Sequence, residues 1–495
     1  MSAKEVLVIG GGLGGISAAI SLAAEGFQVK LFEKNKHLGG KLNRKNIQGF
    51  EFDLGPSILT MPHIFEKLFT IHDKKMEDYI KIIELKKQWR AFFPDDTVLD
   101  LYADSEKMIA KNDCLNSEDL SSVQEYLKYC RELAEFVEKG YFAKGFDSIK
   151  EIIKFHGLIK PFRKLDYFST MSDGTERYLN NPYLIDLFNF FIKYVGSSPY
   201  QAPAVLNLLP HIQFEYGLWY VPGGLYNIAR GLEKLMQEVG ISIYKDSEVI
   251  SINIEHKQVR GITLADGSSF QGDYIVSNME VIPAYQNLIS AFNVPDKYHD
   301  KYEPACSGYV LHLGVDRKYP QLDHHNFFFS QDPRQHFKSV FEDYKLPDDP
   351  TIYLVASSRT DRQQAPVDCE NLKILPHIPH LGKGDFTREE YNKLRERVLI
   401  KLEKMGLTDL RKHIVVEDEW LPEDIKKNYY SNHGSIYGVV SDRKKNKGFK
   451  APKKSEFFDS LYFTGGSVNP GGGMPMVLLS GQQVKELICE NEGGL

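Results

Sequence analysis

The stretch VLVIGGGLGGISAAISLAAEGFQVKLFE, residues Val6–Glu33, decides the fold of this chain. Its first four residues form a short apolar run, which is typical of a buried parallel strand. Gly10, Gly12 and Gly15 then fit the spacing G-x-G-x-x-G. The first glycine allows a tight turn, the second allows backbone amides to approach a pyrophosphate, and the third allows close packing of a helix on the strand. We therefore predict a strand, a phosphate-binding turn and a helix.

The residues after the glycines complete a dinucleotide-binding pattern. Ile16–Ala24 is small and aliphatic, which predicts a helix whose N-terminal amides and dipole face a phosphate, and Gly26 is expected to end it. Val29–Phe32 is the predicted second strand. Glu33 follows it about 20 residues after the glycines, where a carboxylate accepts hydrogen bonds from a ribose 2′-OH. A 2′-phosphate would be repelled there, so the pattern favours an unphosphorylated adenosine ribose.

Composition describes an ordinary globular protein. The 495 residues are 42% hydrophobic and 26% charged, which allows two or three domains with substantial cores. A net charge of −6 gives no electrostatic argument for binding nucleic acid. The five cysteines form no close pair, which argues against a disulfide framework and a zinc site and suits a reducing cytoplasm. We see no signal peptide and no apolar run long enough to span a bilayer.

The pattern changes between about residues 62 and 209, where helical spacing dominates, as in Glu118–Val137. The aromatic stretch LIDLFNFFIKYVG, Leu184–Gly196, predicts either a core helix or a wall of an apolar tunnel. Around Pro161, the basic residues Lys154, Lys160, Arg163 and Lys164 alternate with the apolar residues Phe155, Leu158, Ile159 and Phe162. This pattern fits a solvated helix face or a segment lying in the headgroup region of a membrane.

Alternating strands and helices return after residue 217. We predict a helix over Tyr226–Val239, strands over Ile241–Tyr244 and Glu248–Ile254, and a hairpin at Asp266-Gly267 that joins Val259–Leu264 to Tyr274–Ser277. A second, largely antiparallel sheet is expected from Cys306–Val315, Asn326–Ser330, Thr351–Ala356 and Asn371–Pro376, followed by a helix over Thr387–Met405. The nucleotide-binding domain is thus predicted to be discontinuous.

A second glycine cluster lies near the C-terminus, in LYFTGGSVNPGGGMPMVLLSG, Leu461–Gly481. We predict a short strand over Leu461–Phe463, a close approach of backbone at Gly465 and Gly466, and a final helix over Val477–Ile488. The triple glycine 471–473 before this helix is a second place where backbone amides can meet an anionic or electron-rich ligand. No cysteine lies between residues 465 and 473 that could form a thioether to a flavin.

These segments together resemble the carotenoid (phytoene) desaturase family of FAD enzymes, and the similarity covers essentially the whole chain. It is carried by the fingerprint at Gly10–Glu33 and by four longer strings: FDLGPSILTMP (Phe52–Pro62), FIKYVGSS (Phe191–Ser198), SNMEVIPAY (Ser277–Tyr285) and GGSVNPGGGMPMV (Gly465–Val477). The resemblance implies an α/β fold with a discontinuous Rossmann-type FAD-binding domain over residues 1–75, 215–290 and 440–495. A mixed α+β substrate domain would take residues 76–214 and 291–439 and include a helical, membrane-proximal region.

The resemblance also implies the contacts of a non-covalently bound FAD. The pyrophosphate would meet Gly10, Gly12, Leu13, Gly14 and Gly15, and the adenosine ribose would meet Glu33. Along the cofactor would lie Gly40, Lys41, Gly55 and Pro56, with Val249 near the adenine. The flavin end would lie by Gly465, Gly466, Gly473 and Met474.

Two departures from the desaturase pattern bear on the reaction. Desaturases usually carry Gly-Gly-Arg where this chain has Gly39-Gly40-Lys41, and Thr-His-Pro-Gly where it has Val468–Gly471. The second form is similar to that of family members that oxidise a terminal methyl of a C30 carotenoid in staphyloxanthin-type biosynthesis. The resemblance therefore implies a carotenoid oxygenase lying on the cytoplasmic face of the membrane, of undetermined oligomeric state and with an apolar substrate.

Other functions remain as alternatives. A carotenoid desaturase or isomerase would act on the same class of substrate, and a lipid-binding carrier would keep the fold without redox use. An amine oxidase is a further possibility, although no aromatic cage is assignable from the sequence. A metal site is not expected: His324 and His325 would face opposite ways on a strand, and His377 and His380 flank Pro379. No catalytic acid or base is identified.

Overall fold

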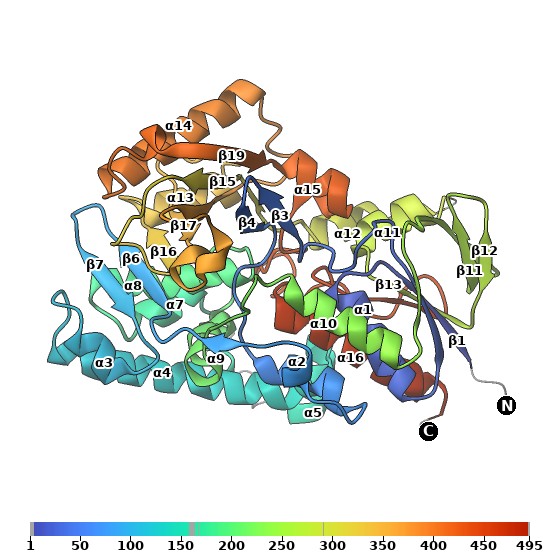
Figure 1. The fold of residues 1–495 in the computed structure, drawn as a ribbon. Helices are drawn as coiled ribbons and strands as arrows, with labels where there is room; N and C mark the ends of the chain where they lie inside the picture. Colours follow the sequence, from blue (N-terminus) through green and yellow to red (C-terminus); the bar gives the residue numbers. More distant parts are fainter. Residues whose placement is uncertain (1–3, 158–163, 167, 291, 494–495) are drawn as a thin grey trace.

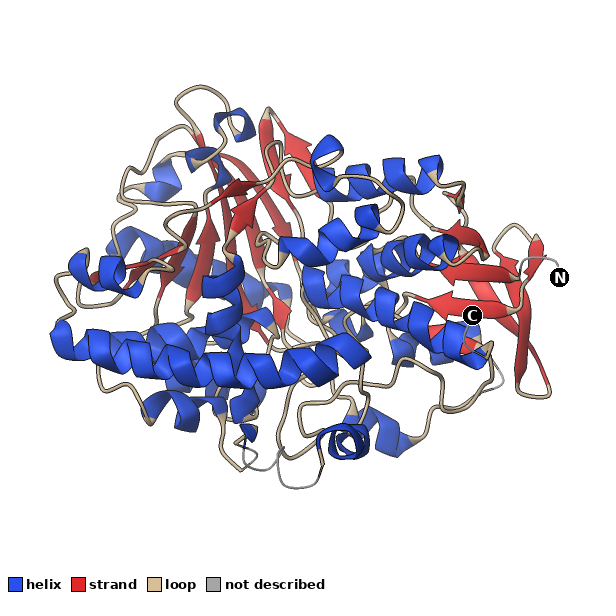
Figure 2. Cartoon of the chain, turned by 90° about the horizontal axis from the view of Figure 1, so that it is seen from below, coloured by secondary structure: helices blue, strands red, loops and turns tan. Residues whose placement is uncertain are grey.

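A computed structural model gives the structure and describes residues 4–157, 164–166, 168–290 and 292–493. Its strands gather in two groups at opposite sides of the molecule, with helices between and below them (Figures 1 and 2). The two ends of the chain lie near each other, beside the first group of strands. No helix in the described ranges has the length and apolar character needed to cross a membrane.

The first group of strands contains a five-stranded parallel sheet in the order β20-β13-β1-β2-β9. Its members are β1 (Glu5–Ile9), β2 (Gln28–Phe32), β9 (Ser242–Tyr244), β13 (Tyr274–Ser277) and β20 (Leu461–Phe463). All five were predicted as strands. They come from three separate parts of the chain, so the sheet is discontinuous in sequence as expected. The exact domain boundaries remain a prediction.

Three helices pack beside this sheet: α1 (Leu13–Ala24), α10 (Asn227–Glu238) and α16 (Met474–Asn491). Both α1 and α16 begin earlier than predicted, because Gly12 and Gly473 occupy the capping positions and the proline near the start of α16 is compatible with a first helical turn. The two helices touch, since a Cβ on Gly481 would lie only 2.6 Å from the carbonyl oxygen of Gly14. The first and last helices of the chain therefore lie side by side.

The predicted hairpin at Asp266-Gly267 is wrong in its second strand. The turn joins β11 (Gln258–Leu264) to β12 (Ser269–Gln271), and these strands form a three-stranded antiparallel sheet with β10 (Val249–Glu255). Tyr274–Ser277 instead joins the parallel sheet as β13. The reason lies in the side chains: β13 is buried throughout, as a central parallel strand requires, whereas the polar β12 is largely exposed at a sheet edge.

The second group is an eight-stranded sheet in the order β19-β15-β18-β17-β16-β6-β7, with β14 paired to β18. It is antiparallel except between β16 and β6, which confirms the predicted second sheet. Its strands are β6 (Trp89–Phe92), β7 (Val98–Leu101), β14 (Ser307–Gly308), β15 (Val310–Val315), β16 (His325–Phe328), β17 (Ile352–Val355), β18 (Glu370–Ile378) and β19 (Ile414–Trp420). Sequence analysis missed β6, β7 and β19, of which β19 is half exposed and acidic.

The two faces of the eight-stranded sheet carry different side chains. One face packs under α14 (Arg388–Lys404) in an apolar cluster that includes Phe92, Phe328, Ile352, Leu354, Leu372 and Ile374. The register places Trp89, His325, Phe327, Tyr353, Lys373 and His377 on the opposite face. We call these the apolar face and the polar face.

A helical region lies below the two sheets, along the lower edge of Figure 1. It consists of α3 (Ser105–Ala110), α4 (Ser117–Val137), α5 (Ile149–His156), α7 (Met171–Glu176), α8 (Pro182–Asn189), the 3₁₀ segment η3 (Phe190–Tyr194) and α9 (Leu208–Tyr216). The predicted helix over residues 118–137 is confirmed as α4, which begins at a capping box formed by Asn116 and Asp119.

Smaller elements connect these parts. They are α2 (Pro62–Thr70), α11 (Val281–Leu288), α12 (Asp296–Lys301), α13 (Pro333–Phe341), α15 (Pro422–Tyr429) and the strand pairs β3 (Arg44–Ile47) with β4 (Phe50–Asp53) and β5 (Ile83–Glu84) with β8 (Trp219–Tyr220). All five cysteines are free. Most of the basic segment around Pro161 lies outside the described residues.

Candidate functional site

The glycine turn after β1 is too crowded for larger side chains. Gly10 has a φ of +92°, in the left-handed region that favours glycine. A Cβ on Gly15 would lie 2.1 Å from the carbonyl oxygen of Gly10, so this glycine lets α1 pack closely on β1. The capping residue of α1 is Gly12, which has no side chain to bind the first turn, and this leaves the amides of Leu13 and Gly14 available to an anionic ligand.

The predicted segment at Gly40 lies against this turn. The amide of Gly39 donates a hydrogen bond of 2.8 Å to the carbonyl oxygen of Gly11. A Cβ on Gly40 would lie 3.1 Å from the Cα of Gly12. Two glycine-containing loops therefore meet backbone to backbone where the sequence places the pyrophosphate.

Glu33 ends β2 with its carboxylate buried at the same turn. One oxygen accepts a 2.8 Å hydrogen bond from the amide of Gly11, and the other accepts bonds from the amide and side chain of Asn35 at 2.9 and 2.7 Å. The amide of Ser247 donates to the Glu33 carbonyl oxygen, and Val249 begins β10 two residues later. Glu33 and Val249 thus lie at one end of the glycine turn, while their contacts with ribose and adenine remain predictions.

Sequence analysis missed Asn278, which links the N-terminal and C-terminal glycines. Its Oδ1 atom accepts hydrogen bonds from the amide of Gly15 at 3.1 Å and from the hydroxyl of Thr464 at 3.2 Å. A Cβ on Gly14 would lie 2.5 Å from the same atom. Its position gave a usable signal, because a polar residue directly after a buried parallel strand lies at the ligand-binding edge of such a sheet.

The two glycine clusters meet around this residue. A Cβ on Gly14 would lie 2.9 Å from the backbone nitrogen of Gly465, and a Cβ on Gly466 would lie 3.5 Å from the Cα of Gly472. Gly473 then caps α16, whose first residue, Met474, is buried. The backbone of the N-terminal glycine turn therefore lies close to that of the C-terminal one, with the Asn278 side chain beside the contact.

Lys41 and Gly55 lie together beside this path. The Lys41 ammonium donates hydrogen bonds to a carboxylate oxygen of Glu280 at 3.1 Å and to the carbonyl oxygen of Ser435 at 2.9 Å. A Cβ on Gly55 would lie 1.7 Å from the carbonyl oxygen of Lys41, so only glycine fits there, and the half-buried Pro56 follows.

Lys373 joins this segment to the polar face of the eight-stranded sheet. Its ammonium donates to the carbonyl oxygen of Gly55 and, at 3.1 Å, to the hydroxyl of Ser57. Burial lowers the pKa of Lys373 to about 8, while the charge of Asp53 acts in the opposite direction. Sequence analysis missed this lysine, because its strand otherwise looks like ordinary sheet core.

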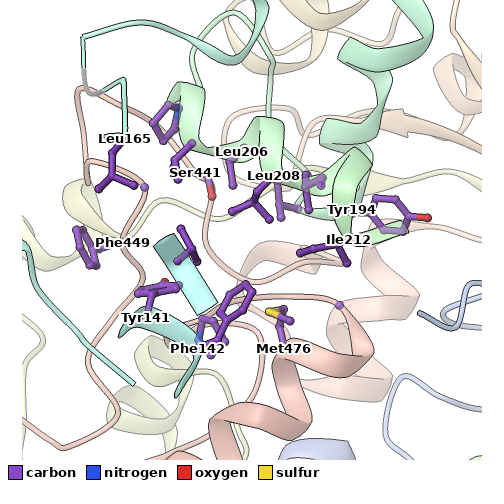
Figure 3. Close-up of a pocket in the computed structure, with 18 of the residues that line it drawn as sticks. Tyr141, Phe142, Leu165, Tyr194, Leu206, Leu208, Ile212, Ser441, Phe449 and Met476 are labelled. Atoms are coloured by element: carbon purple, nitrogen blue, oxygen red, sulfur yellow. The ribbon is translucent and has the colours of Figure 1, made fainter. Parts of the chain in front are cut away.

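An apolar pocket opens beside the C-terminal glycines (Figure 3). Gly472, Gly473 and Met476 line it from one end of the chain. The helical region supplies most of the remaining wall, with Tyr141, Phe142, Ile149, Ile152, Leu206, Leu208 and Ile212. The aromatic stretch over residues 184–196 fits both interpretations in part, since its first half is buried in the core whereas Tyr194 and Val195 line the pocket.

Asn469 is one of the departures from the desaturase pattern, and both polar atoms of its side-chain amide form hydrogen bonds within the protein. Its Oδ1 atom accepts hydrogen bonds from the hydroxyl of Tyr141 at 2.6 Å and the amide of Lys450 at 2.8 Å. Its Nδ2 atom donates to Asp147 at 3.0 Å, and Asp147 pairs with the fully buried Lys453 at 2.5 Å. This network holds a wall of the apolar pocket against the C-terminal glycine turn.

The neighbouring histidines considered as metal ligands form hydrogen bonds to different partners. His324 Nδ1 lies 2.7 Å from the hydroxyl of Thr360, and His325 Nδ1 lies 2.9 Å from the hydroxyl of Tyr353. Burial lowers the pKa of His324 to about 4 and that of His377 to about 3. In the described part of the chain, no group of three histidine, cysteine or acidic side chains is arranged to hold a metal ion.

An aromatic cage exists that the sequence did not reveal. The rings of Trp89, Tyr194, Phe327 and Tyr353 surround the ammonium of Lys193, with centroids 4.4 to 5.0 Å from Nζ. Because a side chain of the protein itself fills this cage, it is not free to take an amine substrate.

Comparisons with known proteins agree with this geometry. A model of the family described as flavin-containing amine oxidoreductase matches residues 13–488. The 4,4′-diaponeurosporene oxygenase of Staphylococcus haemolyticus (strain JCSC1435) is 56% identical over 489 residues, covering 99% of this chain and 97% of the relative. The protein of the same name from Staphylococcus aureus (strain USA300) is 54% identical over 490 residues, covering 99% of both chains.

Solved structures share the fold at low sequence identity. Putrescine oxidase bound to putrescine superposes with a TM-score of 0.66 at 12% identity over 99% of both chains. A Methanosarcina mazei oxidoreductase gives a TM-score of 0.64 at 14% identity, covering 97% of this chain and all of the other. Since the family model spans nearly the whole chain, the chain belongs to the flavin-containing amine oxidoreductase family and is an FAD-dependent oxidoreductase.

Proposed function

We propose that this enzyme oxidises the terminal methyl group of a C30 carotenoid of the 4,4′-diaponeurosporene type to the aldehyde or carboxylate. The observation that carries the proposal is 54% to 56% identity, over 489 to 490 residues, with two proteins named 4,4′-diaponeurosporene oxygenase. Their names favour oxygenation over the alternative, desaturation of a related polyene. The experiment below distinguishes these outcomes.

The apolar pocket supports a substrate of this kind. A polyene hydrocarbon has no charge and no polar handle, so recognition must rest on shape and on buried apolar area. Aliphatic and aromatic side chains supply most of the pocket wall, and Gly472 and Gly473 form its border with the predicted flavin end. A chain end lying in this pocket would come close to the C-terminal glycine turn.

The residues present fit FAD. Around the turn, a Cβ at Gly14, Gly15 or Gly40 would collide with or crowd neighbouring backbone, so a small-residue cradle is maintained there. No cysteine lies in residues 465–473, and non-covalent binding is therefore part of the proposal. When bound, the flavin supplies a two-electron acceptor for oxidation at the terminal carbon.

The protein's own residues have to position the substrate and exclude water. Tyr141 and Phe142 form one wall of the pocket, and Asn469 fixes the Tyr141 hydroxyl against the C-terminal turn. Orientation of this kind contributes a large share of catalysis when a single carbon of a long chain must react. The proposal requires no acid or base for the first oxidation.

Peripheral attachment to the inner face of the cell membrane is the second part of the proposal. Ile149 and Ile152 of α5 line the pocket, while Lys150, Lys154 and the 49%-exposed Phe155 of the same helix face solvent. A basic, apolar surface next to an apolar pocket would suit withdrawal of the substrate from lipid. Flotation with anionic liposomes tests this part, and Phe155→Ser should weaken binding.

The deciding experiment expresses this chain in a host that produces 4,4′-diaponeurosporene, under ¹⁸O₂ gas. Mass spectrometry of the pigments should show products that gain oxygen at the chain end, and the isotope identifies the source of the oxygen. Products that lose only hydrogen would overturn the proposal in favour of desaturation. A Gly14→Val chain expressed to the same level is the control for background oxidation.

A further inference from the structure

Lys193 is a buried amine that the proposed reaction does not use. It belongs to η3 and is only 4% exposed. Its Nζ atom lies 4.8 Å from the ring centroid of Trp89, 4.4 Å from Tyr194, 5.0 Å from Phe327 and 4.5 Å from Tyr353. Within the described ranges of the chain, this atom makes no hydrogen bond or ion pair, and burial is the cause of its pKa shift.

Burying an amine without a hydrogen-bond partner is energetically unfavourable, and a residue with only a structural role has no need of it. Buried polar groups in native proteins nearly always have hydrogen-bond partners, and an isolated buried charge is strongly penalised. Aromatic faces attract a cation but accept no ordinary hydrogen bond from it. Burial accordingly holds the pKa of Lys193 well below its usual range. A methionine would fill the same cage without this penalty, so the amine needs another reason.

The surroundings of Lys193 point to a ligand with a hydrogen-bond acceptor. His325 lies on the same sheet face as Phe327 and bonds Tyr353 through Nδ1, while its buried Nε2 atom has no partner in the described part of the protein. The Tyr353 hydroxyl thus meets the His325 imidazole, while the Lys193 Nζ atom lies 4.5 Å from the centroid of the same tyrosine ring.

The cage also adjoins the apolar pocket. Tyr194 follows Lys193 in the chain, forms one side of the cage and lines the pocket. A Cβ on Gly473 would lie 3.8 Å from the carbonyl oxygen of Tyr194, which places this residue directly beside the C-terminal glycine turn. Tyr194 therefore forms a shared wall between the cage around the Lys193 amine and the pocket in which the proposed chain end would be oxidised.

We propose that Lys193 binds the carbonyl oxygen of the substrate after its first rounds of oxidation, when the apolar methyl end has become an aldehyde. The amine donates a hydrogen bond to that oxygen, while the adjoining conjugated carbons lie in the apolar pocket that Tyr194 borders. Lys193 thereby selects the partly oxidised chain end over the hydrocarbon. This inference rests on the proposed function, because only an oxygenating enzyme produces such an end group.

The test compares two ligands of equal length on FAD-loaded protein in detergent micelles. Quenching of protein fluorescence measures the affinity for 4,4′-diaponeurosporene and for its terminal aldehyde. Lys193→Met should bind the hydrocarbon as the parent protein does and the aldehyde about tenfold more weakly, as expected for one lost hydrogen bond. Lys193→Gln retains a donor and should recover part of the aldehyde affinity. Lys401→Met is the matched control, because Lys401 is a buried lysine of α14 that pairs with Asp349, away from the pocket.

Equal changes in the affinities for both ligands, or no change in either, would overturn the inference. Thermal melting of each variant separates loss of fold from loss of selectivity, and Lys193→Gln carries the comparison if Lys193→Met does not fold. If the parent protein fails to oxidise the hydrocarbon at all, the proposed function falls. The difference in aldehyde affinity between parent and variant still decides the role of Lys193.

Discussion

The apolar and polar faces of the eight-stranded sheet are equally buried but differently built. Under α14, Leu354, Ile374 and their neighbours form a core in which fully buried apolar side chains interlock. On the opposite face, strands of the same sheet bury His325, His377 and Lys373. A core needs no titratable groups for stability, and burying them is unfavourable. The contrast therefore indicates that the polar face is maintained for function.

The pKa values support this difference. Burial lowers the pKa of His377 to about 3 and that of Lys373 to about 8, so the polar face disfavours the charged form of both groups. Perturbed groups of this kind concentrate at functional sites, although ion-pair networks also perturb pKa values. Here Lys373 donates a hydrogen bond to the carbonyl oxygen of Gly55, one of the glycines in the cofactor assignment.

The largest expected effect is on the apolar face. Leu354→Ala removes a fully buried side chain from the cluster under α14 and should lower the free energy of unfolding by about 3 kcal/mol. Urea denaturation followed by circular dichroism measures this loss. The folded fraction should give the same ratio of aldehyde to hydrocarbon as the parent enzyme, and a changed ratio would contradict the division between the two faces.

The next effect is on the cofactor. Gly14→Val introduces a Cβ that would lie 2.9 Å from the Gly465 nitrogen and 2.5 Å from Asn278, so the two glycine clusters must move apart. We expect FAD affinity to fall by about 2 kcal/mol, or roughly 30-fold. Flavin absorbance after gel filtration measures the bound fraction. Ala24→Val is the control, because Ala24 lies in the same helix with its side chain exposed to solvent. Normal FAD binding by the Gly14 variant would refute the cofactor assignment.

Much of the nucleotide-binding part was predictable from the sequence because its signals are local. The glycine spacing, the apolar strand β1 and the acidic residue Glu33 lie within one short stretch, and each has a single physical reason to be there. The convergence of Gly14 and Gly465 was predictable only through family resemblance, since no local rule connects residues more than 400 positions apart in the chain.

The polar face was not predictable for a related reason. In the sequence, Lys193 looks like the polar residue of an aromatic core helix, and Lys373 looks like an interruption in a buried strand. Their significance comes from strand register and from contacts with Gly55 and Tyr353, which exist only after folding. Strands β6 and β7 were not predicted either, and the cage could not be predicted without them because β6 supplies Trp89.

A smaller effect, on how the free energy of unfolding depends on pH, is expected from Lys373. Its pKa falls from 10.5 to about 8 on folding, so between these values the unfolded chain binds more protons and the free energy of unfolding rises with pH. In Lys373→Met, the slope of the free energy of unfolding against pH should be smaller than in the parent by at most about 1.4 kcal/mol per pH unit between pH 8 and 10.5. Below pH 8 the slopes of variant and parent should be equal. Urea denaturation at several pH values from 7 to 10.5 measures the slope. Parallel curves would show that Lys373 is not desolvated in solution.

The smallest expected effect compares one hydroxyl on each face. Tyr353→Phe removes the hydrogen bond to His325 on the polar face, and Tyr309→Phe removes the 3.0 Å bond to Glu419 at the apolar cluster. Each should cost about 1 kcal/mol of stability, measured by urea denaturation, because each loses one hydrogen bond. Only Tyr353→Phe should also change the ratio of aldehyde to hydrocarbon products, since the lost hydroxyl orients His325 beside the cage around Lys193. If both variants change that ratio equally, the two faces differ in composition but not in role, and the histidines and lysines of the polar face would need a structural explanation.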